Sequence, residues 1–210
     1  MIINNSAPVA QLDRACGYEP QGREFESLRA RQKEKEMRRI ITGHNKEGKS
    51  VIKIDGPPLR SVGEDVGGLF EIWNTDGNPI DSTDTIDKTD TEIILSPSPG
   101  GSKFRYFKIN PRPEGVPLDV LEELAAQGFK RIGAEHERVD TTRDPTMHKT
   151  KTIDYIILLE GNVTLLLDDD EVQLKPFDVV VQRGTNHAWI NNGSEPALFI
   201  AVLIDANITE

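Results

Sequence analysis

The residues best suited to chemistry lie in one stretch, 147–191, which begins MHKTKTIDYIILLEG and ends QRGTNHAWIN. Successive side chains of an extended strand point to opposite faces, so every second residue shares a face. The residues that share one face in this way are His148, Thr150, Thr152 and Asp154. His187, on a later strand, can reach them only if the sheet closes or folds over. Two imidazoles and a carboxylate that converge at the mouth of a closed sheet are suited to bind a metal ion.

The same stretch resembles the two sequence motifs of the cupin superfamily. In the first motif, G-x5-H-x-H-x3,4-E-x6-G, the first histidine, the glutamate position and the last glycine correspond to His148, Asp154 and Gly161. In the second motif, G-x5-P-x-G-x2-H-x3-N, the later glycine, the histidine and the asparagine correspond to Gly184, His187 and Asn191.

Four positions depart from these motifs. Thr150 stands where the second histidine is expected, and Asp154 is shorter than a glutamate. Phe177 replaces the opening glycine of the second motif, one residue closer than usual, and Gln182 replaces a common proline. The resemblance is therefore specific for the fold and only partial for a metal site with four ligands.

The resemblance implies an all-β fold, a double-stranded β-helix or jelly-roll barrel with one short accessory helix, as in small single-domain type-2 cupins. It implies one divalent metal ion (Fe, Mn, Ni, Co or Zn) held by His148, Asp154 and His187, with the two histidines as catalytic residues. The implied enzyme acts on a small molecule that bears carboxylate or hydroxyl groups, by lyase, isomerase or dioxygenase chemistry. Since cupins commonly pair, a homodimer is expected.

Other functions remain open because Thr150 is a poor metal ligand. The chain is alternatively a non-catalytic small-molecule-binding cupin with a degenerate metal site. In a metal-free pocket, His148 and His187 would act as hydrogen-bond donors or as a proton-transfer pair, and Asp154 would fix one imidazole tautomer. A third possibility is a relic of the fold that interacts through an exposed sheet edge.

Several further residues are candidates for the pocket around these histidines. They are Thr150, Thr152, Gln182, Trp189 and Asn191. Trp189 shares the face of His187, so we expect it to form a wall of the cavity. Tyr155 has the opposite parity to Asp154, so we expect it to pack behind the site.

The segment 102–109 alternates well enough to form a strand. One of its faces carries Lys103, Arg105 and Phe107, and the other carries Phe104, Tyr106 and Lys108. Either orientation brings an aromatic ring and a cation toward the interior, where the cation would bind an anionic substrate. The alternative is a cation that lies on the surface.

Composition excludes some partners. The chain has 210 residues and a formal net charge of -10, which disfavours nucleic acids and anionic membranes because phosphate contacts need a basic surface. The longest apolar run, 197–204, is far shorter than the roughly 20 residues of a transmembrane helix. The single cysteine, Cys16, cannot form an internal disulfide. A cytoplasmic protein that binds a small-molecule ligand is therefore expected.

The N-terminal segment 1–36 is expected to be non-native or disordered. It has no secretory signal, and its text resembles a conceptual translation through a transfer RNA gene, whose T arm would read as Phe25-Glu26-Ser27. On this hypothesis Met37 is the true start and Cys16 is not in the natural protein. The alternative is a real helical extension, because 25–39 is rich in helix-forming residues.

From residue 37 onward the pattern predicts mostly strands. We expect 37–146 to supply N-terminal strands, a mobile loop at 76–90 and one helix packed on the barrel, and 147–210 to form the barrel core. The helix is predicted from Pro117 to Phe129 and should end at Gly128.

The pattern makes a specific prediction for each of two further strands. A strand is predicted at 91–95. The closing strand, 197–204, is apolar on both faces, so the N-terminal strands of the same chain or of a partner should cover its outer face.

Overall fold

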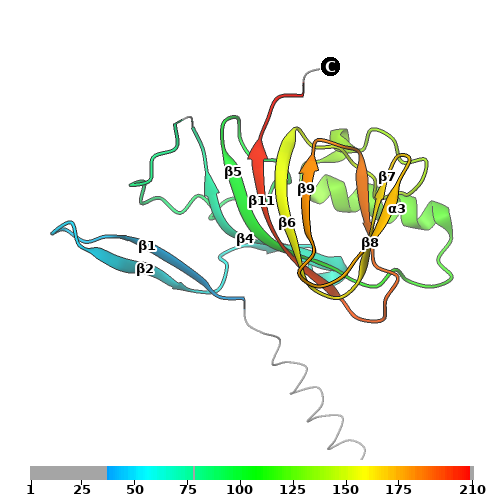
Figure 1. The fold of residues 1–210 in the computed structure, drawn as a ribbon, viewed down its shortest axis with the longest axis horizontal. Coiled ribbons are helices and arrows are strands. Elements are labelled where there is room, and N and C mark those ends of the chain that lie inside the picture. Colours follow the sequence, from blue (N-terminus) through cyan, green and yellow to red (C-terminus); the bar gives the residue numbers. More distant parts are fainter. Residues whose placement is uncertain (1–36, 78, 209–210) are drawn as a thin grey trace, which may run out of the picture. The chain divides into compact units, whose positions relative to one another are not determined.

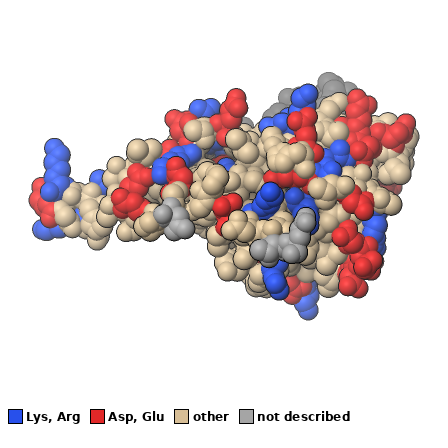
Figure 2. Space-filling view, turned by 90° about the horizontal axis from the view of Figure 1, so that it is seen from above, with Lys and Arg blue, Asp and Glu red and all other residues tan. Residues whose placement is uncertain are grey.

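The structure is a computed structural model that describes residues 37–77 and 79–208. The two hypotheses for residues 1–36 lie outside this described part. The chain divides after Arg38, and the unit Arg39–Glu210 contains every element named below. Within the described ranges, no helix has the length and apolar character needed to cross a membrane. Acidic and basic side chains are interspersed on the face shown in Figure 2.

Two antiparallel sheets form the body of the fold (Figure 1). The larger sheet has the strand order β3-β4-β5-β11-β6-β9. Its strands are β3 (Ser61–Val62), β4 (Gly67–Thr75), β5 (Ser102–Ile109), β11 (Ala197–Asp205), β6 (Thr152–Glu160) and β9 (Val179–Arg183). The smaller sheet has the order β10-β7-β8. Its strands are β10 (His187–Ile190), β7 (Val163–Leu167) and β8 (Glu171–Leu174).

A separate hairpin joins β1 (Arg39–His44) to β2 (Ser50–Gly56). The amide side chain of Asn45 accepts hydrogen bonds from two backbone N–H groups of the turn, as turn asparagines commonly do. The N-terminal strands predicted within 37–146 therefore include this hairpin. Arg39 fixes the start of the hairpin, because its guanidinium donates to the carbonyl of Ile72 at 3.1 Å and pairs with Asp87 at 2.7 Å.

The two sheets pack face to face through a common apolar core. Phe199 of β11 is 0% exposed, and its ring stacks on Phe107 of β5 with centroids 4.5 Å apart. Trp189 of the smaller sheet lies 5.2 Å from Phe199, and Leu165 of β7 belongs to the same buried cluster. The predicted all-β double-stranded barrel with an accessory helix is confirmed.

The barrel extends beyond the predicted core of 147–210. β5 is hydrogen-bonded along its whole length to β11, with Ala197 opposite Ile109 and Ile204 opposite Ser102. β4 in turn pairs with β5. Strands from the first half of the chain are therefore integral to the larger sheet and do not merely pack on it.

The accessory helix, α3 (Leu118–Arg131), runs past the glycine that was predicted to end it. Pro117 precedes the first turn, where its missing N–H costs no helical hydrogen bond. Gly128 lies inside the helix, and the chain leaves the helix through Gly133, which has a φ of 63°. The left-handed conformation after the last turn is the usual requirement for glycine at a helix C-terminus.

The strand predicted at 91–95 is wrong, because no strand occupies this segment in the structure. The backbone N–H of Leu95 donates to the carbonyl of Ile132 after α3, at 2.9 Å. The carbonyl of Ile94 accepts a hydrogen bond from the side chain of Arg105 at 3.1 Å. Local strand propensity was overridden here because these partners satisfy the backbone without a neighbouring strand.

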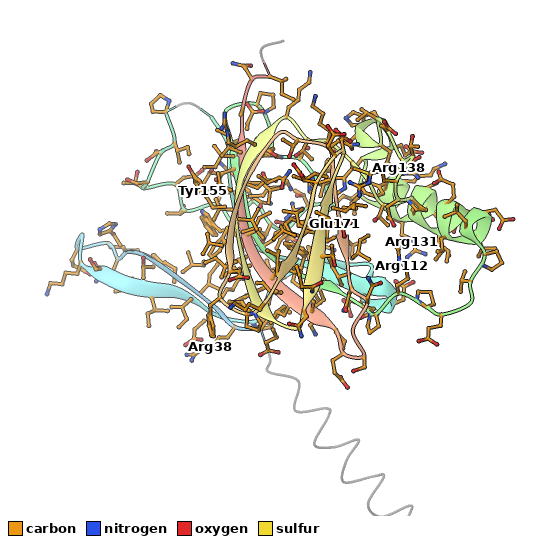
Figure 3. All side chains as sticks on the ribbon, turned by 45° about the vertical axis from the view of Figure 1, so that its right-hand side comes forward. Arg38, Arg112, Arg131, Arg138, Tyr155 and Glu171 are labelled. Carbon is orange, nitrogen blue, oxygen red and sulfur yellow. The ribbon has the colours of Figure 1, made fainter. Side chains whose placement is uncertain are left out.

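The outer face of the larger sheet carries exposed apolar side chains. Tyr155 of β6 is 50% exposed, and Val179 and Val181 of β9 are 65% and 53% exposed. Figure 3 shows Tyr155 on the side of the barrel away from α3. The parity predicted for Tyr155 is correct, but no described residue buries its ring behind the site.

Candidate functional site

His148 and His187 lie side by side although 38 residues separate them in the chain. Their backbones form an isolated β-bridge, in which each N–H donates to the other residue's carbonyl at 2.9 Å. Their ring centroids are 4.3 Å apart, with the ring planes inclined by 45°. The folding of the sheet therefore brings the two candidate imidazoles together at one place.

Both imidazoles are held in the same tautomer by the backbone. Nδ1 of His148 lies 3.0 Å from the carbonyl of Thr146, and Nδ1 of His187 lies 2.9 Å from the carbonyl of Thr185. A carbonyl oxygen only accepts, so each Nδ1 must carry the hydrogen and donate. In the neutral ring the other nitrogen, Nε2, then has a free lone pair.

Burial keeps both rings neutral at physiological pH. It lowers the pKa of His148 to about 4 and, together with the neighbouring His148, lowers the pKa of His187 to about 3. The hydrogen bonds to Thr146 and Thr185 oppose this shift only in part. Two unprotonated Nε2 atoms, one from each histidine, are consequently available at the same place in the fold.

Asp154 does not join the two histidines. It lies on the inner face of β6, opposite Gln182 of β9, whereas His148 pairs with His187 beside the smaller sheet. Within the described residues, no three His, Cys, Asp or Glu side chains are grouped so that they could hold a metal ion. The chain passes from one sheet to the other between Thr150 and β6, so the predicted set of three ligands is not assembled.

Asp154 instead belongs to a charged cluster inside the barrel. Its side chain is 4% exposed, and burial raises its pKa to about 6, although Thr152 and Arg105 lower it in part. Oδ1 of Asp154 has no hydrogen-bond partner among the described residues. Glu71 lies 2.7 Å from the guanidinium of Arg105 and 3.7 Å from Nζ of Lys103.

The residues of this cluster show which face of β5 points into the barrel. Lys103, Arg105 and Phe107 face inward, and Arg105 is only 1% exposed, so the alternative of a surface cation is wrong. Glu137, in the 3-10 turn η2 (Glu135–Glu137), lies close enough to Arg105 for the charges to interact, and it accepts a hydrogen bond from Ser96. The sequence showed the period of β5 but contained no local signal for its carboxylate partners.

The five predicted pocket residues divide into two groups. Thr150 and Thr152 are buried and share a hydrogen bond of 2.6 Å, and the amide of Gln182 donates to Thr185. None of these three is among the residues that line the cavity described next, whereas Trp189 and Asn191 are.

A cavity of about 520 Å³ lies between α3 and the barrel. Its apolar walls come from β4, β5, α3 and β10, and include Leu69, Ile109, Leu121, Leu124, Ala125, Phe129, Ile132 and Trp189. Figure 3 shows Arg112 and Arg131, which also line it, on the side of the barrel where α3 lies. A cavity of this size is typical of small-molecule sites.

Neither His148 nor His187 is among the residues that line this cavity, but two aromatic rings that line it contact them. The ring of Phe129 lies 4.8 Å from that of His148, and the ring of Trp189 meets His187 edge-on at 5.5 Å. The prediction that Trp189 forms a wall of the cavity agrees with this geometry. Phe129 was missed because it lies on a helix distant in the sequence, and only the packing of α3 brings it to the site.

Comparison with known proteins gives consistent matches. A family model described as a cupin domain matches residues 136–203. Phomopsin biosynthesis cluster protein C' of Diaporthe leptostromiformis is 31% identical over 162 residues, covering 73% of this chain and 69% of that protein. The cupin-domain-containing oxidoreductase fogC of Aspergillus ruber is 28% identical over 180 residues, covering 80% and 72% of the two chains.

Among solved structures, a Cupin 2 conserved barrel domain protein from Salinispora arenicola CNS-205 aligns with a TM-score of 0.31 and 16% identity. The alignment covers 50% of this chain and 64% of that one, which is less than two thirds of its length.

Proposed function

The chain belongs to the cupin superfamily, and from this premise we propose that it is an enzyme whose chemistry takes place at His148 and His187. The observation that carries the proposal is the pair of neutral imidazoles with free Nε2 atoms beside a cavity of small-molecule size. Relatives are named cupin-domain-containing oxidoreductases, which favours redox chemistry, such as that of a dioxygenase, over a lyase or isomerase.

The two imidazoles meet the chemical requirement for ligands of a divalent metal ion, because metal binding needs the unprotonated nitrogen. We propose that Nε2 of His148 and of His187 would hold such an ion. When bound, the ion would supply a Lewis acid or a redox centre and leave positions open to the substrate. Protein sites for zinc or iron usually have three or more protein ligands, so two histidines without Asp154 should bind it more weakly.

The remaining groups have defined roles in this proposal. The carbonyls of Thr146 and Thr185 hold the rings in orientation and keep the proton on Nδ1. Phe129 and Trp189 pack against the imidazoles and reduce their contact with water, while His148 stays partly exposed. The low pKa values favour the metal hypothesis over a proton-transfer pair, since a base whose pKa is about 3 or 4 accepts protons poorly near pH 7.

Metal analysis of protein purified without a chelator tests the proposal. We expect bound iron, manganese, nickel, cobalt or zinc, loss of that metal in His187→Ala, and a circular dichroism spectrum unchanged in His148→Ala and His187→Ala. His136→Ala is the matched control, because the side chain of His136 is 78% exposed.

The proposal fails if no metal co-purifies and added metals leave the melting temperature unchanged. That result would support the second candidate function, a non-catalytic cupin that only binds a small molecule. The undersized ligand set favours this candidate, because Thr150 stands where a third ligand is expected and bonds to Thr152 instead.

We also propose that two copies of the chain pair through the outer face of the larger sheet. The exposed side chains Tyr155, Val179 and Val181 support this, because contiguous apolar patches of this kind commonly mark protein interfaces. Tyr155 and Val181 are direct neighbours across β6 and β9.

A further inference from the structure

We propose that the cavity between α3 and the barrel binds a small molecule made of an apolar body and one carboxylate, and that Arg112 holds the carboxylate. This inference rests on the proposed function in one respect, namely that the molecule is the substrate of the histidine pair. Its binding can nevertheless be measured without any reaction.

The walls of the cavity select an apolar body. On α3, the side chains of Leu121, Leu124 and Ala125 line the cavity, facing Leu69 and Ile109 of the larger sheet. Leu124 remains 51% exposed, so apolar surface is left in contact with water. Covering such surface is favourable by about 25 cal/mol per Å², and a bound apolar body would provide that cover.

The charged residues at the same cavity favour an anion. They are Asp65, Lys108, Arg112 and Arg131, three cations and one carboxylate in a chain whose net charge is -10. Arg131 lies 3.3 Å from Asp65, in an ion pair with both side chains more than half exposed. Lys108 lies over the ring of Phe70, 5.7 Å from its centroid. The cations that line the cavity therefore outnumber the carboxylates that line it.

Arg112 is the best placed of these cations to hold a carboxylate. Its backbone N–H donates to the carbonyl of Asn191 at 2.8 Å, which fixes the residue against β10. One guanidinium nitrogen pairs with the buried Asp144 at 2.5 Å, which orients the side chain. A guanidinium has five N–H donors, so donors remain for a second, bidentate carboxylate partner.

The buried Arg105 does not compete for this role. Although its Nε and Nη1 have no hydrogen-bond partner among the described residues, it is 1% exposed inside the barrel and does not line the cavity. Arg112, in contrast, keeps 32% of its side chain exposed and lines the cavity. The anion site expected from the sequence is therefore assigned to a different arginine from the one that the strand pattern suggested.

The arrangement also orients the substrate. Arg112, Phe129 and Trp189 line one cavity, and the two rings contact His148 and His187. A molecule whose carboxylate binds Arg112 would extend its apolar body toward these rings. Its reacting atom would then lie at the end remote from the carboxylate.

The test compares two ligands of the same shape, 2-naphthoic acid and the neutral 2-naphthamide, by isothermal titration calorimetry. We expect the acid to bind the full-length protein about tenfold more tightly, as one charge-assisted contact worth about 1.4 kcal/mol would produce. Arg112→Gln should remove this preference by weakening the acid about tenfold while leaving the amide unchanged.

Two further variants locate the site. Leu124→Glu should weaken both ligands, because it places a charge on an exposed part of the apolar wall. Arg60→Gln should change neither, because Arg60 forms an exposed ion pair with Asp90 and does not line the cavity. In His187→Ala, the preference for the acid should persist, so that this inference and the proposed metal chemistry fail independently.

Three results would overturn the inference: equal binding of acid and amide, equal losses for both ligands in Arg112→Gln, or no binding of either ligand. Loss of the acid preference in His187→Ala with none in Arg112→Gln would place the carboxylate at the histidines and overturn it too.

Discussion

Each face of the larger sheet carries some residues of a type that is unusual there, although the inner face also supplies the apolar core. The inner face buries Lys103, Arg105 and Asp154, while the outer face exposes Tyr155 and Val181. Buried charges are costly unless they are paired, and large exposed apolar patches are uncommon on monomers. Alternation along a strand therefore does not by itself indicate which face of the sheet is apolar throughout. The inner face depends on an ion-pair network, and the outer face is suited to an interface.

The largest effect should come from breaking the inner network. Arg105→Met leaves Glu71 buried with only the more distant Lys103, and removing one partner of a buried pair typically costs about 3–5 kcal/mol. Urea unfolding at pH 7 should show this loss, and the double variant Glu71→Gln/Arg105→Met should recover most of it.

The matched control is Arg60→Met, which breaks an ion pair of the same 2.7 Å length, with Asp90, between exposed side chains. It should cost less than about 1 kcal/mol. Equal losses for Arg105→Met and Arg60→Met would show that burial does not distinguish the two pairs.

An intermediate effect should follow the ionisation of Asp154. Its pKa in the folded protein is raised from 3.8 to about 6, so its contribution to stability is fully present below about pH 4 and is lost as the pH rises through about 6. A shift of about two units corresponds to roughly 3 kcal/mol. Asp154→Asn should therefore gain stability relative to wild type, on the order of 2–3 kcal/mol, between pH 4 and pH 8.

The free energies of unfolding of Asp154→Asn and of wild type, measured in urea across this pH range, show whether the variant is the more stable of the two. Asp140→Asn should show no such trend in this range, because hydrogen bonds from Thr142 lower the pKa of the exposed Asp140 below its usual 3.8, so that its contribution to stability changes only at lower pH. The prediction is refuted by a difference between Asp154→Asn and wild type that stays constant with pH.

The smallest effect on the stability of one chain should come from the outer face. Val181→Lys should change the free energy of unfolding of the monomer by no more than about 0.5 kcal/mol, as for most surface substitutions. It should nevertheless convert the proposed dimer to a monomer in sedimentation velocity, because a charge would be buried at the proposed interface.

Val172→Lys is the matched control, since Val172 is 50% exposed and Val181 is 53% exposed, but Val172 lies on β8 of the smaller sheet. It should leave the dimer intact. A wild-type protein that sediments as a monomer at tens of micromolar would contradict the proposed dimer interface on this face.

Much of the local structure could be predicted from alternation and turn residues. The hairpin β1–β2, the strands β5, β7, β8 and β11 and most of α3 follow from these signals. The prediction at 91–95 failed because the hydrogen-bond partners of that segment, after α3 and on Arg105, are not visible in a local window. The predicted end of the helix at Gly128 was wrong for a related reason, since the packing of α3 outweighs the modest free-energy cost of a glycine inside a helix.

The candidate site was predictable only in part. Motif spacing identified His148 and His187, and the fold brings them within 4.3 Å, centroid to centroid. The same spacing assigned Asp154 to them, yet Asp154 is paired with Gln182 in the other sheet. Spacing along the chain cannot show where a strand changes sheets.

By itself, the sequence determined which residues share a face, because the period of two in a strand is a property of the backbone. It thus grouped Lys103 with Arg105, and Thr150 with Asp154, without any tertiary information. Only the tertiary structure decided which face turns inward and which groups meet, including Arg105 with Glu71 and His148 with His187. These decisions depend on pairing between strands far apart in the chain, where burial of the whole core outweighs the preference of any single segment.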